Sequence, residues 1–431
     1  MFIKNLESLA KTPLRRDALL VAEAGLEAIS PKNFLPREVR LVGEVLLVKK
    51  DEIDLRKFRR IFIVGIGKAA LDSAEYLEKI LGARVSGGAV IDTRSKKLKR
   101  IKSFLGTHPL PSAQNAKATA EIMKIARNTK RGDLIIAIIS GGGSSLIFKP
   151  KGNSIASARR VFSLLLDSGA DIEEINTVRK HISEAHGGNL VRLANPASVL
   201  GLVFSDVPFD NPSLVASGPT FLDTATKKDA QNILSRYGIN DIRLSETPKD
   251  RKIFSKTKNI LLLSNADALK AMEIKAQELG YRTFVGRGFV RGEASEVGEE
   301  LLRGLKNDGE MVVYGGETLV RVTNKNGKGG RNMDLVLGGL KYLKKGQVLL
   351  SIASDGVDNI VDAAGALADR EILRKATESG LDPGEFLLTN NSYLFFRRAG
   401  GVIKCGKTGS NVSDLMLVAQ KKSQNKKRAK K

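Results

Sequence analysis

The stretch LIIAIISGGGSS, residues 134–145, decides the fold of this chain. Its apolar run, Leu134 to Ile139, has no polar face, which is typical of a strand that is buried on both faces in a parallel sheet. The glycines that follow let backbone N–H groups point together at an anion, at the strand end where open α/β sheets bind ligands. The sequence therefore predicts an anion site here, although a tight turn that needs positive φ explains the glycines equally well at this point.

The length and composition of the chain favour a two-domain protein. Its 431 residues exceed what one hydrophobic core usually organises, so we expect two domains with a cleft between them. No apolar run approaches the ~20 residues that span a bilayer, and the amino terminus lacks a signal-peptide pattern. We therefore expect a cytoplasmic protein without a membrane partner. A single cysteine, Cys405, excludes an internal disulfide, and the three histidines form no zinc-type cluster with it.

The formal net charge of the chain is +24, and its distribution indicates the kind of partner. Seven of the cationic residues lie in the last eleven, Lys421 to Lys431, a low-complexity tail whose composition predicts disorder. The remaining excess is spread over the whole chain, which suits an enzyme that attracts anionic metabolites. Nucleic-acid binding favours a clustered basic stripe with interleaved aromatic residues, so we do not expect a nucleic-acid partner, except through the tail.

Hydrophobic periodicity predicts how the chain is organised. One long helix, Thr12 to Ile29, precedes an alternation of strands and helices, which is the pattern of an α/β fold with a mostly parallel sheet. Periodicity fades and charge rises between Arg236 and Lys258, which marks a domain boundary. We therefore predict a Rossmann-like domain over residues 1–240, a second, smaller α/β domain over 241–420, and a disordered tail over 421–431.

A glycine turn after the first predicted strand matches the dinucleotide-binding fingerprint. Gly65, Gly67 and Ala70 have the G-x-G-x-x-A spacing, and Asp92 ends the next strand, where an acid that binds ribose would lie. Lys68 follows the second glycine, and a phosphate or carboxylate ligand explains a cation at that position better than a ribose does. The turn therefore leaves three interpretations open: an NAD(P)-dependent oxidoreductase, a phosphate site, and a turn that only packs a helix.

Charged residues at other strand ends and loops extend the predicted site. Asp206 follows a buried strand at the ligand-binding edge of the sheet, although it could also cap the next helix. Arg331, between glycines and a helix start, could clamp a phosphate or lie solvated at the surface. Asp355, Asp358 and Asp362 could help to hold magnesium, although acid-glycine turns are also common in plain loops. Together these residues indicate phosphoryl transfer, in which an aspartate accepts the hydroxyl proton and cations steady the phosphoryl group.

The motifs together resemble the glycerate 2-kinase family, whose carboxyl-terminal half is called the MOFRL domain. The match runs in order over almost the whole chain, through residues 65–69, 107–109, 140–145, 176–181, 205–207, 216–220, 315–318, 329–332, 354–356 and 409–414. Four residues depart from the family pattern: His186, Asn359, Asn391 and Lys407.

The resemblance implies phosphorylation of D-glycerate at its 2-hydroxyl, with ATP and Mg²⁺, in a cleft between a Rossmann-like domain and a smaller α/β domain. The residues that it implies as catalytic are Lys68, Asp206 and Arg331. For substrate or phosphate binding we predict Ser140, Gly141, Gly142, Gly143, Ser144, Arg179, Glu317 and Asn411, and we predict Asp355 as a metal ligand.

Two other functions stay open at this point. The first is an NAD(P)-dependent oxidoreductase that acts on hydroxypyruvate or glycerate, carried by the Gly65 turn and Asp92. The second is a non-enzymatic module that binds phosphometabolites, with the basic tail reaching RNA. For the kinase, the expected partners are D-glycerate and a nucleotide, and the sequence leaves a homodimer open.

Overall fold

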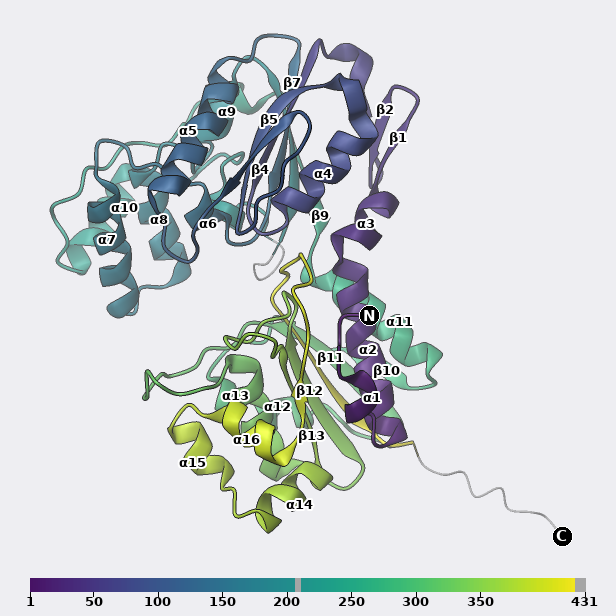
Figure 1. Cartoon of the computed structure of the whole chain (residues 1–431). Coiled ribbons are helices and arrows are strands. Elements are labelled where there is room, and N and C mark those ends of the chain that lie inside the picture. The colour runs from purple at the N-terminus through teal and green to yellow at the C-terminus, as the bar shows by residue number, and fades with distance from the viewer. Residues whose placement is uncertain (206–210, 423–431) are drawn as a thin grey trace. The chain divides into compact units, whose positions relative to one another are not determined.

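A computed structural model describes residues 1–205 and 211–422, and Figure 1 shows the chain. The chain forms two compact units, one made of Met1–Ser30 with Ser264–Lys431 and the other of Pro31–Leu263. The units divide the chain at residue 263 rather than at the expected residue 240, because strand β9 (Thr257–Leu263) still pairs with β8 (Ser198–Phe204) of the first sheet. Each unit is described by itself below.

A parallel sheet forms the centre of the Pro31–Leu263 unit. Its strand order is β6-β5-β4-β7-β8-β9, and every neighbouring pair is parallel, as the sequence predicted. The remaining strands are β4 (Arg60–Ile66), β5 (Val85–Asp92), β6 (Ile101–Leu105) and β7 (Asp133–Ile139). Every residue of β7 is buried, because helices cover the sheet on both faces.

The two faces of this sheet are covered by different helices (Figure 1). Helix α4 (Ala70–Leu81) packs on β4 and β5 from one face, and α5 (Ala113–Arg127) and α9 (Asn189–Ala194) pack on the other. Alternate residues of the central strands, such as Ile135, Ala137 and Ile139 of β7, belong to the core cluster on the α5 and α9 side. Successive side chains of the strand point to opposite faces, so each face of the sheet receives every second residue.

Smaller elements complete this unit. A three-stranded antiparallel sheet consists of β1 (Val39–Val42), β2 (Val45–Val48) and β3 (Asp51–Asp54). The helices are α3 (Pro31–Glu38), α6 (Gly143–Leu146), α7 (Ile155–Asp167), α8 (Ile172–Ile182) and α10 (Lys227–Arg236). Helices α7, α8 and α10 share a separate core cluster around Phe148 and Phe162.

The second unit contains a mixed sheet of order β10-β11-β15-β12-β13-β14. Only the β10 and β11 pair is parallel among its described strands, and the other neighbours are antiparallel. Its strands are β10 (Arg282–Val285), β11 (Glu310–Gly316), β12 (Gln347–Ala353), β13 (Gly365–Asp369), β14 (Val402–Ile403) and β15 (Asp414–Gln420). Its helices after residue 263 are α11 (Asn265–Glu278), α12 (Ala294–Leu302), α13 (Arg331–Gly339), α14 (Arg370–Glu378), α15 (Pro383–Leu388) and α16 (Ser392–Ala399).

The first thirty residues belong to this second unit rather than to the expected amino-terminal domain. Helix α2 (Pro13–Ile29), which follows the short α1 (Leu6–Leu9), packs against α11, where Gly25 leaves only 2.8 Å between the place of a Cβ and the Met272 side chain. The Tyr281 hydroxyl donates to Asp17 at 2.7 Å, and the Ser410 hydroxyl donates to the Ile29 carbonyl at 2.7 Å. Burial against distant segments therefore fixes the helix in this unit.

Candidate functional site

The order of the strands reverses inside the parallel sheet, between β4 and β7. Counted along the chain from β4, the order reads 3-2-1-4-5-6, so the connections leave in opposite directions from β4 and from its neighbour β7. Open α/β sheets bind ligands outside the strand ends at such a reversal. The turn after β4 contains Lys68, and the turn after β7 is the glycine triplet, so the two sequence-predicted motifs lie at this position.

The two turns are held together by short polar contacts. The Ser140 hydroxyl donates to the Ile66 carbonyl at 3.1 Å and accepts the N–H of Ala69 at 3.1 Å. The N–H of Lys68 donates to the carbonyl of Gly141 at 3.0 Å. Gly67 has φ +111°, and a Cβ there would lie 2.3 Å from the Ser140 hydroxyl oxygen and 2.4 Å from its carbonyl oxygen. Only glycine permits this approach.

This contact brings Lys68 beside the glycine triplet. Gly142 has left-handed φ of +76°, and a Cβ there would lie 3.4 Å from Lys68 Cγ and 3.2 Å from the His108 ring. Within residues 1–205 and 211–422, the N–H groups of Gly141 and Gly142 make no backbone hydrogen bond. A cationic side chain and unused backbone donors in one turn are the features of an anion-binding loop.

Asp92 has a structural role instead of the ribose-binding role that the fingerprint allowed. Its carboxylate is fully buried and accepts the N–H of Leu71 at 3.1 Å in the first turn of α4. It also accepts from the Thr93 hydroxyl and from the N–H of Arg94, both at 3.3 Å. Burial raises the pKa of this carboxyl to about 6. The Asp92 carboxylate therefore accepts its hydrogen bonds from the protein itself rather than from a ribose.

Arg179 extends the site from helix α8. Its Nη1 donates to Asn176 Oδ1 at 2.7 Å and to the Ser217 hydroxyl at 3.3 Å, and Ser217 pairs with the Ser144 hydroxyl at 2.9 Å. Its guanidinium lies 5.0 Å from the centre of the Phe162 ring. No ion pair joins Arg179 to a carboxylate of the described residues, and desolvation lowers its pKa to about 10. A half-buried guanidinium without an acid partner favours an anionic ligand.

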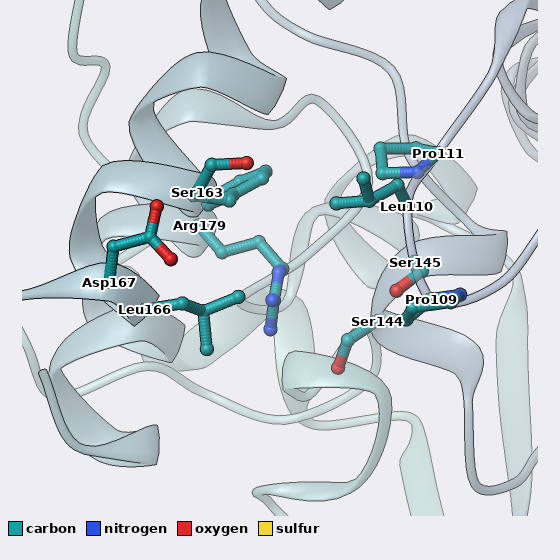
Figure 2. Close-up of a pocket in the computed structure, with 10 residues that line it drawn as sticks. Pro109, Leu110, Pro111, Ser144, Ser145, Ser163, Leu166, Asp167 and Arg179 are labelled. Carbon is teal, nitrogen blue, oxygen red and sulfur yellow. The ribbon is translucent and has the colours of Figure 1, made fainter. Parts of the chain in front are cut away.

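Arg179, Ser144 and Phe162 border a cavity of about 280 Å³, shown in Figure 2. Ser144 and Ser145 lie on one side, together with the proline-rich loop 109–111, and helix α7 lies on the other. Arg179 extends between the two sides in this view. The candidate site thus includes Asn176 and Ser217, which sequence reasoning did not select as site residues although both lie in quoted motifs.

Asp206, the predicted proton acceptor, lies outside the described residues. Ser205 precedes it at the end of β8, where its N–H donates to the carbonyl of Leu263 at 2.7 Å. Strand β8 pairs with β7, so Ser205 lies at the same edge of the sheet as the glycine triplet.

In the second unit, Arg331 begins helix α13 and is held by two acids. Its Nε and Nη2 donate to the two oxygens of Asp414 at 2.6 and 3.0 Å, and its Nη1 donates to Glu317 at 2.7 Å. These carboxylates raise the pKa of the guanidinium further above its usual value. The structure therefore joins the predicted residues Arg331 and Glu317, and adds Asp414, which sequence reasoning quoted only as the end of a motif.

A second buried acid orders the start of α13. Asp358 accepts the N–H of Asn332 at 3.2 Å and that of Met333 at 2.9 Å, so it caps the helix from a distant loop. Burial and the nearby Asp414 raise its pKa to about 7. Two departures from the family pattern support the glycine loop before the helix: Asn359 donates to the Gly329 carbonyl at 3.0 Å, and Asn391 accepts the N–H of Lys328 at 3.0 Å.

The predicted residues Asp355 and Asn411 belong to another loop pair of this unit. Asp355 Oδ1 accepts the N–H of Val357 at 3.1 Å, and the Asp355 carbonyl accepts the N–H of Thr408 at 3.3 Å. Asn411 accepts the N–H of Ser413 at 3.2 Å. Across the described ranges, no group of three or more His, Cys, Asp or Glu side chains could hold a metal ion, so Asp355, Asp358 and Asp362 do not assemble one.

His186 is buried beside Arg179 and Lys180. Neither ring nitrogen has a hydrogen-bond partner among the residues that the structure describes, and the ring lies 6.2 Å from that of Phe148. Desolvation, together with the charges of Arg179 and Lys180, holds the pKa of the imidazole well below its usual value. The imidazole is therefore neutral in the folded chain.

None of the described helices is long and apolar enough to cross a bilayer.

Comparison with known proteins finds relatives over most of the chain. Residues 17–247 match the family described as Domain of unknown function (DUF4147), and residues 310–414 match the MOFRL family. The chain is 32% identical to a glycerate 2-kinase from Pyrococcus horikoshii, over 92% of this chain and 95% of that protein. It is 34% identical to a protein from Agrobacterium vitis that is provisionally named hydroxypyruvate reductase, over 83% and 87% of the two chains. A solved structure of glycerate kinase from Thermotoga maritima aligns with a TM-score of 0.83 and 30% identity, over 95% of this chain and 99% of that one.

We predict that His186 makes the stability of the protein depend on pH in mildly acidic solution. Above pH ~6.5 the imidazole is neutral in both states and contributes no pH dependence. Below it, only the unfolded chain takes up the proton, so the free energy of unfolding should fall by up to about 1.4 kcal/mol per pH unit. Urea unfolding between pH 5 and pH 8 measures this slope, and His186→Leu should reduce it. An unchanged slope in His186→Leu would contradict the buried, neutral state of the ring.

Proposed function

Because the chain belongs to the glycerate 2-kinase family, and is therefore a kinase, we propose that it transfers the γ-phosphoryl group of ATP to the 2-hydroxyl of D-glycerate, forming 2-phosphoglycerate and ADP. The observation that carries this proposal is the position of Lys68 beside the glycine triplet, where the strand order of the sheet reverses. We also propose the cytoplasm as its location, since its donor ATP is a cytoplasmic metabolite.

The phosphate groups would be held by the loop after β7. Backbone N–H groups of Gly141 and Gly142 can donate to phosphate oxygens, with Ser140 and Gly143 shaping the turn. Lys68 and Arg179 would supply positive charge from two sides, and the Ser144 hydroxyl a further donor. Phosphoryl transfer needs mostly such positioning and charge stabilisation, because the reaction makes little demand on covalent catalysis.

Asp206 would receive the proton of the substrate hydroxyl. The glycerate 2-oxygen attacks the γ-phosphorus, the bond from that phosphorus to the bridging oxygen breaks, and ADP leaves with the electron pair. The hydroxyl proton moves to the carboxylate as the new bond forms. The supporting observation is that Ser205 lies at the end of β8, next to β7.

We also propose Arg331 as a catalytic residue, although its acid partners limit the number of N–H groups that it can offer to a ligand. A guanidinium has five N–H donors, and three of them are used on Asp414 and Glu317. Two N–H groups are left for a substrate carboxylate or a phosphoryl oxygen. The acids hold the side chain in place, and we propose that Glu317 and Asn411 contribute to substrate binding in the same unit.

Magnesium enters the proposal as the counter-ion of the ATP phosphates, where it would neutralise developing charge. Mg²⁺ is usually bound through one or two carboxylates, with the other positions taken by phosphates and water. A single carboxylate such as Asp355 fits this need, whereas an all-protein cage of three acids is not assembled by the described residues. We therefore propose Asp355 as a ligand of the ATP-bound ion.

The oxidoreductase alternative is not favoured. The fingerprint needs an acid that can bind ribose hydroxyls, and the carboxylate of Asp92 is fully buried and accepts hydrogen bonds from Leu71, Thr93 and Arg94. Lys68 occupies the turn before α4. The close contact with Ser140 explains why residue 67 must be glycine, so this glycine does not require a dinucleotide ligand.

The reaction is tested by incubating the protein with ATP, Mg²⁺ and D-glycerate and recording phosphorus NMR. We expect 2-phosphoglycerate and ADP to appear, and Asp206→Asn should slow turnover on the order of 100-fold or more, because a positioned base is lost. Consumption of NADH with hydroxypyruvate would support the oxidoreductase instead. A folded Asp206→Asn variant with near-normal turnover would contradict the role of Asp206.

Arg179 permits a cleaner test than Arg331, because no described carboxylate would be left buried and unpaired by its removal. We predict that Arg179→Gln lowers kcat/KM on the order of 100-fold, since one preorganised cation is typically worth about 3 kcal/mol. The thermal midpoint should stay unchanged, because Ser217 and Asn176 keep their mutual hydrogen bond of 2.7 Å.

The matched control for this variant is Arg159→Gln, on the exposed face of α7, which should retain wild-type kcat/KM. Equal activity of the two variants would contradict the assignment of Arg179 to the anion site.

A further inference from the structure

The cavity beside Arg179 combines polar groups with apolar walls. Its polar groups include the Ser144 hydroxyl, next to the glycine triplet, and the Arg179 guanidinium. Around these groups the walls are apolar, with Leu110 and Pro111 on the side of Ser144 and Leu166 on the α7 side. Leu166 is 59% exposed, so this face of the cavity presents apolar surface that the folded chain leaves uncovered.

The walls of the cavity are fixed before any ligand binds. The buried Asn115 side chain donates from Nδ2 to the Thr107 carbonyl and to the Ser145 carbonyl, both at 2.9 Å, and it accepts the N–H of Thr107 at 2.9 Å. This network ties the proline-rich loop to the short helix after the glycine triplet. On the opposite wall, Phe162 packs edge-on against Phe148, with ring centres 5.4 Å apart. Ligand pockets in proteins are commonly preformed in this way.

Of the two proposed substrates, only ATP matches this combination of polar groups and apolar walls. D-Glycerate consists of a carboxylate and two hydroxyl groups on a three-carbon chain, so it gains little from apolar walls. ATP joins a planar aromatic base to a chain of phosphates. The cavity of about 280 Å³ is close to the ~300 Å³ at which small-molecule pockets begin, so it suits a base better than a single phosphate.

The charges in the cavity decide the orientation. Asp167 lies at the α7 side, one helical turn after Ser163, and its carboxylate would repel phosphates there. The uncompensated guanidinium of Arg179 and the backbone donors of the glycine triplet attract phosphates to the other side. A carboxylate and a hydroxyl can instead bind the amino group of a base or the hydroxyls of ribose.

We propose that this cavity is the nucleoside-binding subsite of the phosphoryl donor. The adenine base lies between the proline-rich loop and Leu166, Ser163 and Asp167 bind its polar edge or the ribose, and the phosphates extend past Arg179 to the glycine triplet. This inference rests on the proposed kinase function, and it adds the residues that distinguish a nucleotide from a simple polyphosphate.

The test is to fill the space beside the apolar side chain of Leu166 and to compare two probes that differ only in the nucleoside. We expect Leu166→Trp to weaken binding of ADP by roughly tenfold or more, as pocket-filling changes typically do, and to leave binding of inorganic tripolyphosphate unchanged. In turnover, KM should rise for ATP and stay constant for D-glycerate. Calorimetric titration of the full chain gives the affinities.

Two variants complete the design. Leu164→Trp, on the same helix and 38% exposed, does not line the cavity and should bind ADP like the wild type. Asp167→Asn should weaken ADP and leave tripolyphosphate equal or tighter, because a negative charge is removed from the cavity.

The possible results separate this inference from the kinase assignment. If Leu166→Trp and wild type bind ADP equally, or if ADP and tripolyphosphate weaken together, the subsite is overturned even when 2-phosphoglycerate is formed. A rise in KM for D-glycerate alone would assign the cavity to the acceptor and also overturn it. If Leu166→Trp selectively weakens ADP but no 2-phosphoglycerate is formed, the subsite stands and the proposed reaction falls.

Discussion

The close approach of two turns is the constraint on which the candidate site depends. Strands β4 and β7 end side by side, and Gly67 lies so close to Ser140 that a single methyl group would not fit. The Ser140 hydroxyl bridges the Ile66 carbonyl and the Ala69 N–H across this contact. Because the turns touch, Lys68 lies next to Gly142, and the backbone donors of the triplet lie beside a cationic side chain. If the two turns lay farther apart, Lys68 and the glycine triplet could not bind the same anion.

Two arginines illustrate how the surroundings of a cation decide what it can do. Arg331 is held by Asp414 and Glu317, so much of its charge is neutralised and its orientation is fixed. Arg179 is bound by neutral groups, and desolvation destabilises its charge until an anion approaches. The free energy that a phosphate gains at Arg179 is therefore larger than at an arginine already paired, provided that geometry permits contact. This difference makes Arg179 the stronger candidate for ligand charge recognition in its unit.

Local patterns allowed much of the fold to be predicted, and long-range contacts account for the rest. The apolar run before the triplet identified a doubly covered strand, and the alternation of strand and helix patterns identified the α/β class, because both signals lie in residues close together in the sequence. The place of helix α2 could not be predicted, since it is decided by burial against α11 and by hydrogen bonds to Tyr281 and Ser410. Residue spacing likewise could not predict that Asp414, 83 residues away, pairs with Arg331, or that Asn115 bridges a loop and a short helix. Asp206 lies outside the described residues, so its predicted role stays a prediction.

The most direct test of the central claim is the affinity for tripolyphosphate when a methyl group is placed between the two turns. Gly67→Ala should weaken binding by at least roughly tenfold, because the added Cβ would force Ser140 and Lys68 apart. Gly82→Ala is the matched control: Gly82 ends the same helix α4 at φ +56° with no atom within 4 Å of its Cβ position, so it carries backbone strain without the clash. We expect Gly82→Ala to bind tripolyphosphate like the wild type. Wild-type affinity in a folded Gly67→Ala variant would contradict the claim that contact between these turns builds the phosphate site.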